Sequence, residues 1–188
     1  YPLPFPDGTF DEILSHSSLE HISWRKVKDI LLDWRRVLKR GGAVRIWMPD
    51  LEYLARNYLA GKKDEHLDPA YIPEIKQLLG DYTPAIWATI KLFGGQDYPD
   101  NFHSAVYDFK TFSSILKSAG FERIQRIEPY HGLGVIAYRP LQNETADQTE
   151  DRRPIDACCL PSASLISPSK VRVVIADEGW ILEKMARE

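Results

Sequence analysis

The sequence predicts an α/β fold with a mixed sheet, helices on both faces and an antiparallel last pair of strands. Three observations support this prediction. An amphipathic helix is followed directly by a glycine pair and a strand, which is typical of an α/β layer. Two later strand-like segments lie so close in the chain that they must run antiparallel. Of the 188 residues, 44% are hydrophobic and 11% aromatic, enough to bury a sizeable core.

The amphipathic helix is the clearest element. Its apolar residues recur at helical spacing on one face: Val27, Ile30, Leu31, Trp34, Val37 and Leu38. Gly41-Gly42 is expected to end this helix, because glycine accepts the left-handed conformation without steric cost. Residues 43–48 then read as a strand, and the apolar run at 10–15 has the length of an earlier one.

The middle of the chain is expected to be mostly helical. Short helices are predicted at 51–59 and 72–79, and the segment 83–93 is apolar enough to cover a pocket or a partner. After a loop at 94–102, Asp108 is placed to cap a further helix. The antiparallel strands are predicted at 121–127 and 133–138.

The composition changes after residue 139. Residues 140–169 are polar, charged and rich in Pro and Ser, so we expect a disordered linker. Residues 170–188 resume order with a strand at 171–175 and a helical spacing at 179–187. Such a β-α stub cannot bury a core alone, and we expect it to begin a second domain after a first domain at 1–139.

Composition excludes several classes of function. The 24 Lys and Arg against 27 Asp and Glu give a net charge of −3, which argues against nucleic-acid binding. No apolar run has the length of a membrane span. The only cysteines, Cys158 and Cys159, are adjacent and supply no disulfide framework, which indicates a reducing, cytoplasmic compartment. Because the chain starts at Tyr1, we expect it to be cut from a longer protein.

Two motifs favour a structural interpretation. Residues 132–137 fit the G-x-G-x-x-A dinucleotide pattern, but a strand-like run follows where a helix should begin, so a turn is expected. His16, Glu20 and His21 do not have the i, i+4 spacing of a helical zinc site, and no third ligand is near in the sequence. No metal is therefore predicted.

Two polar segments stand at the ends of the predicted parallel strands. Ligands of open α/β sheets bind outside the carboxyl ends of parallel strands, where loops converge. These ends are residues 15–18 (SHSS) and 49–51 (PDL). The serines can hydrogen-bond a polar ligand, or they can merely cap and turn the chain, and the local sequence does not distinguish the two.

Several short motifs occur in an order that resembles the later half of class I S-adenosylmethionine-dependent methyltransferases, in particular the small-molecule type 11 family. They are LPFPDGTFD at 3–11, LEH at 19–21, RVLKRGG at 36–42, PD at 49–50 and AGF at 119–121. The resemblance covers roughly residues 1–139, with Arg40 in place of the family's usual proline. It implies a partial Rossmann-like sheet and S-adenosylmethionine as cofactor.

The resemblance also implies roles for individual residues. Ser15, His16 and Ser17 would line the cofactor near its reacting methyl group, and Leu19 and His21 would support that wall. A hydroxyl acceptor also needs a base, because a neutral hydroxyl is a poor nucleophile. His103 is the candidate base, since imidazole titrates near neutral pH, and Asp50 is the competing carboxylate. His103 could instead simply pack the inserted region.

One departure from the family pattern concerns the cofactor. The family's first strand with its glycine-rich loop, and the acid that holds the ribose, have no counterpart here. We therefore expect this chain alone not to turn over. Residues 170–188 weakly resemble the opening of a two-domain glycosyltransferase, so the acceptor would be a small molecule or a sugar, with a fused glycosyltransferase domain. The alternative is a non-catalytic α/β module that scaffolds glycan assembly.

Overall fold

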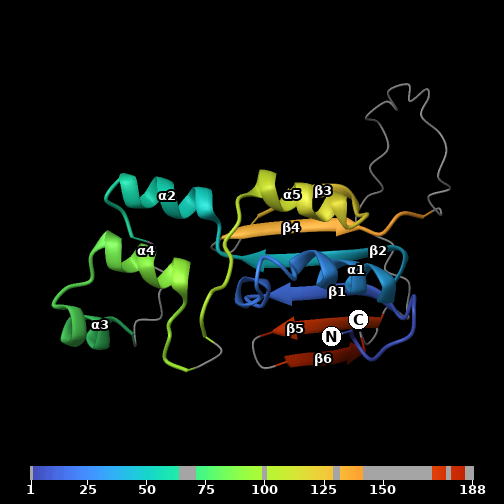
Figure 1. The fold of residues 1–188 in the computed structure, drawn as a ribbon, viewed down its shortest axis with the longest axis horizontal. Coiled ribbons are helices and arrows are strands. Elements are labelled where there is room, and N and C mark those ends of the chain that lie inside the picture. The colour runs from blue at the N-terminus through green and yellow to red at the C-terminus, as the bar shows by residue number, and fades with distance from the viewer. Residues whose placement is uncertain are drawn as a thin grey trace, which may run out of the picture.

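The computed structural model describes residues 2–63, 71–98, 101–128 and 132–141, together with the backbone of two strands at 171–176 and 179–184. One six-stranded sheet organises this part of the chain, in the order β3-β4-β2-β1-β5-β6 (Figure 1). The strands are β1 (Phe10–His16), β2 (Leu38–Met48), β3 (Glu122–Ile127), β4 (Leu133–Tyr138), β5 (Val171–Ala176) and β6 (Gly179–Lys184).

The sheet is mixed, as predicted. β1 runs parallel to both of its neighbours, β2 and β5, whereas the pairs β2–β4, β3–β4 and β5–β6 are antiparallel. The predicted antiparallel arrangement of the strands at 121–127 and 133–138 is confirmed. Because β1 and β2 are adjacent and co-directional, the polar segments that follow them lie at the same edge of the sheet.

Helices α1 (Val27–Val37) and α5 (Phe109–Ser118) pack on the sheet and on each other, so they lie on one face. Their apolar side chains cover the alternate residues Val44, Ile46 and Met48 of β2, all buried. This packing forms the main core. The main helix–sheet contacts of the described residues therefore involve one face, whereas the sequence predicted helices on both.

Three further helices form a separate small cluster beyond the carboxyl ends of β1 and β2 (Figure 1). They are α2 (Leu51–Leu59), α3 (Tyr71–Leu79) and α4 (Pro84–Phe93). Fully buried Trp87 of α4 lies in an apolar group with Leu54 and Ile75. The apolar surface of 83–93 is thus largely used within this cluster, where the sequence predicted that it covers a pocket or a partner.

The glycine pair lies inside a strand and does not end the helix. α1 ends at Val37, and β2 begins at Leu38. Gly41 has φ +73° and donates its N–H to the Arg139 carbonyl at 2.9 Å, while Arg139 donates to the Gly42 carbonyl at 2.9 Å. A Cβ at Gly42 would lie 2.8 Å from the Lys39 carbonyl oxygen. Pairing with a distant segment therefore requires glycine here, and the register of β1 with β2 shifts nearby.

The prediction of a helix at 179–187 is wrong, since Gly179–Lys184 is strand β6. Its backbone pairs antiparallel with β5, from Gly179 opposite Ala176 to Lys184 opposite Val171. A short apolar run fits a strand as well as a helix, and here the pairing with β5 decides. The division into two domains stays a prediction, and almost all of the predicted linker at 140–169 lies outside the described residues.

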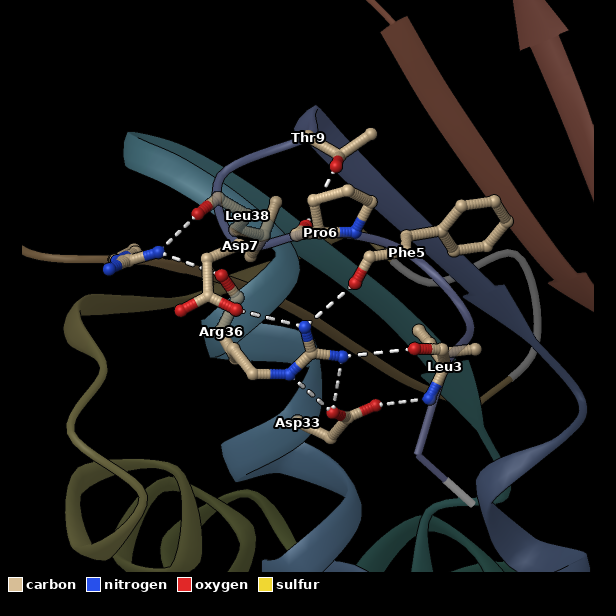
Figure 2. Close-up of polar contacts among 9 residues, drawn as sticks. Leu3, Phe5, Pro6, Asp7, Thr9, Asp33, Arg36 and Leu38 are labelled. Atoms are coloured by element: carbon tan, nitrogen blue, oxygen red, sulfur yellow. Dashed lines mark hydrogen bonds and ion pairs between the residues drawn. The ribbon is translucent and has the colours of Figure 1, made fainter.

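The segment before β1 is held against α1 by one arginine (Figure 2). Arg36 donates to the carbonyl oxygens of Phe5 at 2.7 Å and Leu3 at 3.0 Å. It also pairs with Asp33 at 2.8 Å and with exposed Asp7 at 3.0 Å. This arginine fixes the entry of the chain into the sheet.

Among the described residues, the helices are too short or too polar to span a membrane.

Candidate functional site

The first part of the site is the bend that follows β1. Ser15, opposite Ile46 of β2, is fully buried, and its Oγ has no hydrogen-bond partner among the described residues. The next residue, His16, is exposed and shares a 3.2 Å hydrogen bond with the Ser17 hydroxyl through Nδ1. Ser17 has φ +50°, an uncommon conformation for a residue other than glycine. Its N–H donates to the Trp47 carbonyl at 2.9 Å, which ties the bend to β2.

The second part is the single 3-10 turn η1 (Leu19–His21), directly after the bend. Leu19 is fully buried in the main core, and Glu20 is only 2% exposed. The carbonyl oxygen of Glu20 accepts hydrogen bonds from the N–H groups of Ser104 at 2.6 Å and Ala105 at 3.1 Å. The segment between α4 and α5 is therefore attached to η1, at the end of β1 (Figure 1).

This attachment brings two histidines together. The rings of His21 and His103 have centroids 4.9 Å apart and meet edge to face at 78°. Nδ1 of His103 lies 2.9 Å from the Lys91 carbonyl oxygen, and Nδ1 of His21 lies 3.2 Å from that of Phe102. A carbonyl oxygen only accepts, so each Nδ1 carries the proton and donates it. In this tautomer the lone pair of the ring is on Nε2.

The surroundings of His103 favour its neutral form. Burial lowers the pKa of His103 from its ordinary value of 6.5, and the nearby charges of His21 and Lys91 act in the same direction. The hydrogen bond to the Lys91 carbonyl opposes them. Near neutral pH the ring therefore offers a lone pair at Nε2.

Asp50 stands at the carboxyl end of β2 with both oxygens engaged. Its Oδ1 accepts from the N–H groups of Glu52 at 2.9 Å and Tyr53 at 3.4 Å, which caps α2. Its Oδ2 pairs with Arg126 of β3, and the residue is 1% exposed. A carboxylate held in this way anchors α2 and β3, and the geometry does not favour it as a proton acceptor.

The structure groups the candidate residues differently from the sequence prediction. Glu20, His21 and His103 each place one possible ligand atom within 4.8 Å of the others. The sequence analysis grouped His16 with Glu20 and His21 and identified no convincing further ligand nearby. In the structure the possible third ligand is His103, which follows His21 by 82 positions in the chain. The local sequence gives no signal that these two residues lie close together.

Comparison with known families gives a match at the beginning of the chain. Residues 1–46 match the model of a family described as a methyltransferase domain. The resemblance to class I methyltransferases is confirmed over this segment. The matched residues 1–46 contain β1, η1, α1 and most of β2, and so include the bend at residues 15–18.

Comparison with solved structures gives matches at low sequence identity and with TM-scores below 0.5. A possible exported protein from Bordetella parapertussis is 16% identical with a TM-score of 0.45, over 72% of this chain and 40% of its own. Human N-acetylserotonin methyltransferase, in complex with S-adenosylmethionine, is 14% identical with a TM-score of 0.43, over 74% of this chain and 31% of its own. A methyltransferase from Methanosarcina mazei is 19% identical with a TM-score of 0.40, over 74% of this chain and 64% of its own.

The chain spans between 31% and 64% of the length of these three proteins. A comparison with curated protein sequences finds no match.

Proposed function

We propose that this chain is part of an S-adenosylmethionine-dependent methyltransferase that acts on a small-molecule or sugar acceptor. The match of residues 1–46 to a methyltransferase domain supports the reaction class. The observation that carries the location is the buried Ser15 hydroxyl, which has no partner among the described residues and stands at the carboxyl edge of the parallel strands β1 and β2. An unsatisfied buried hydroxyl is costly, and a polar ligand at this edge would supply its hydrogen bond.

The residues at this edge fit the cofactor in part. Ser15, His16 and Ser17 would hold it, with Leu19 and His21 supporting them from η1. Leu19 is anchored in the core, and Ser17 is tied to the Trp47 carbonyl, so the bend is held at both ends. When bound, the cofactor supplies an electrophilic sulfonium methyl group, and the protein has to align the acceptor and exclude water.

His103 is the proposed proton acceptor when the acceptor group is a hydroxyl. Its Nδ1 donates to Lys91, so Nε2 is available to take the proton. Asp50, the competing candidate, is occupied by its cap and by Arg126. The geometry thus favours His103 over Asp50.

A sugar acceptor is the proposed substrate class. It rests on the resemblance of residues 170–188 to the opening of a glycosyltransferase, and strand β5 agrees with that resemblance. Strand β6 stands where the resemblance implies a helix and removes one of its two supports. Absence of methyl transfer to nucleotide sugars and glycan intermediates would rule out this acceptor class without affecting the reaction class.

Calorimetric titration with S-adenosylhomocysteine tests the cofactor site. Ser15→Ala should weaken binding about 2- to 10-fold, because one hydrogen bond contributes roughly 0.5–1.5 kcal/mol. Ser113→Ala is the matched control, since the Ser113 Oγ is also buried and has no hydrogen-bond partner in the described part of the chain, but belongs to α5. It should bind as the wild type does. No binding by the wild-type chain, or equal binding by the Ser15 variant, would contradict the proposal and favour the scaffold alternative.

A further inference from the structure

We infer that Glu20, His21 and His103 bind a divalent transition-metal ion of the zinc type. The three side chains come from η1 and from the segment between α4 and α5, and their possible ligand atoms lie within 4.8 Å of one another. Two imidazole nitrogens and a carboxylate oxygen form a donor set that zinc uses in catalytic sites. The site itself does not depend on the proposed methyl transfer.

The hydrogen bonds of the two histidines are those of metal ligands. In metal sites, a histidine that binds through one nitrogen usually donates the other N–H to a carbonyl or a carboxylate, which fixes the ring and its tautomer. Here both rings donate from Nδ1 to main-chain carbonyls, His103 to Lys91 and His21 to Phe102. Both lone pairs are thus on Nε2, and the rings are already oriented before any ion arrives.

Burial of the carboxylate is the second argument. Glu20 is 2% exposed, while His21 and His103 are half-buried. Burial of a carboxylate costs free energy unless a positive charge or a metal ion lies beside it. A divalent ion would place that charge among all three side chains.

The backbone holds the two halves of the site together. The N–H of His103 donates to the Phe93 carbonyl at 3.1 Å, so the chain folds back on the end of α4. Ser104 and Ala105 then donate to the Glu20 carbonyl. Gly94 allows this return, because a Cβ there would lie 2.2 Å from the Asn101 carbonyl oxygen. His103 is therefore brought to η1 by main-chain contacts on both sides of it.

Three protein ligands leave one tetrahedral position for water or for an acceptor hydroxyl. The ion and a proton compete for Nε2 of His103. In the metal-bound protein the ion would activate an acceptor hydroxyl, and the base role of His103 would be limited to the metal-free protein. This consequence, unlike the site, rests on the proposed function.

Zinc titration followed by calorimetry tests the site in the full chain. Every variant carries Cys158→Ser and Cys159→Ser, because thiolates bind zinc tightly. We expect one zinc ion per chain. His21→Ala, His103→Ala and Glu20→Gln should each weaken binding by more than about 100-fold, since even the outer partners of metal ligands contribute roughly 10- to 100-fold. His16→Ala, a histidine at the end of β1 but outside the group, is the control and should leave binding unchanged.

Histidine NMR spectra give a second measurement that does not depend on how the variants fold. Zinc should shift the ring resonances of His21 and His103 in the Cys158→Ser, Cys159→Ser protein and leave those of His16 in place. Absence of one-to-one binding, binding that survives His103→Ala, or shifts confined to other histidines would each overturn the inference. Neither measurement uses S-adenosylhomocysteine, so failure of the metal site and failure of the cofactor site are separate results.

Discussion

Replacement of Arg36 by methionine should release the segment before β1. Methionine keeps the aliphatic stem of the side chain and removes the guanidinium group. Two hydrogen bonds to main-chain carbonyls are lost, at Phe5 and Leu3, together with the pair to Asp33 (Figure 2). The hydrogen bonds and charges of Asp7 and Asp33 raise the pKa of Arg36, so the arginine stays charged throughout the experiment.

The expected magnitude follows from these contacts. Hydrogen bonds to a charged group contribute about 1.5–3 kcal/mol each when shielded from water. The Arg36 side chain is 31% exposed, so the lower end of that range applies. Asp7 is 75% exposed, and such surface pairs add little. We expect Arg36→Met to lower the free energy of unfolding by about 3 kcal/mol, at about 1.5 kcal/mol for each of the two main-chain hydrogen bonds.

Urea unfolding measures this loss, and hydrogen exchange locates it. Arg56→Met is the matched control, because Arg56 makes a 2.6 Å ion pair with Glu52 on the surface of α2, with 78% of its side chain exposed. That pair should contribute about 0.3–0.5 kcal/mol. Amides of residues 3–9 should exchange faster only in the Arg36 variant. Equal and small losses in the two variants would refute the reasoning.

Two other predictions concern a helix cap and a glycine. Asp108 caps α5 through the Thr111 N–H at 2.6 Å, and this hydrogen bond lowers the pKa of Asp108 below 3.8. The stabilisation is therefore present above pH 3.8 and lost as the pH falls through the lower folded value, so the urea midpoints of wild type and Asp108→Ala should converge in acid. The loss in Thr83→Ala, a neutral cap of α4, should not change with pH. Gly94→Ala should cost at least about 1 kcal/mol more than Gly80→Ala, because both have positive φ but a Cβ at Gly94 would also clash with the Asn101 carbonyl oxygen. Only the former should weaken zinc binding, and equal effects on stability and binding would contradict the assigned role of Gly94.

Much of the fold could be predicted because it depends on local spacing. The apolar face of α1, the Asp108 cap and the antiparallel strands β3 and β4 are features of short segments, and the structure confirms them. The errors occur where a distant segment decides. The glycine pair at 41–42 is held in a strand by Arg139, and residues 179–184 take their conformation from pairing with β5. Neither partner is visible in the local pattern.

The candidate site, like the fold, could be predicted only where it depends on local sequence. The bend at residues 15–17 could be placed at the edge of the sheet, since that position follows from the direction of β1 and β2. The approach of His103 to His21 could not be predicted, because it is produced by main-chain N–H groups of residues 103–105 that donate to the carbonyl oxygens of Phe93 and Glu20.

These main-chain contacts bear on how the two proposed sites are related. The bend and η1 are consecutive in the chain, and Leu19, between Ser17 and Glu20, is fixed in the core. Because Leu19 is fixed in the core, a ligand at the bend is not expected to move Glu20 or His103. Zinc affinity should then be the same with and without S-adenosylhomocysteine, because two sites with no coupling free energy do not change each other's binding.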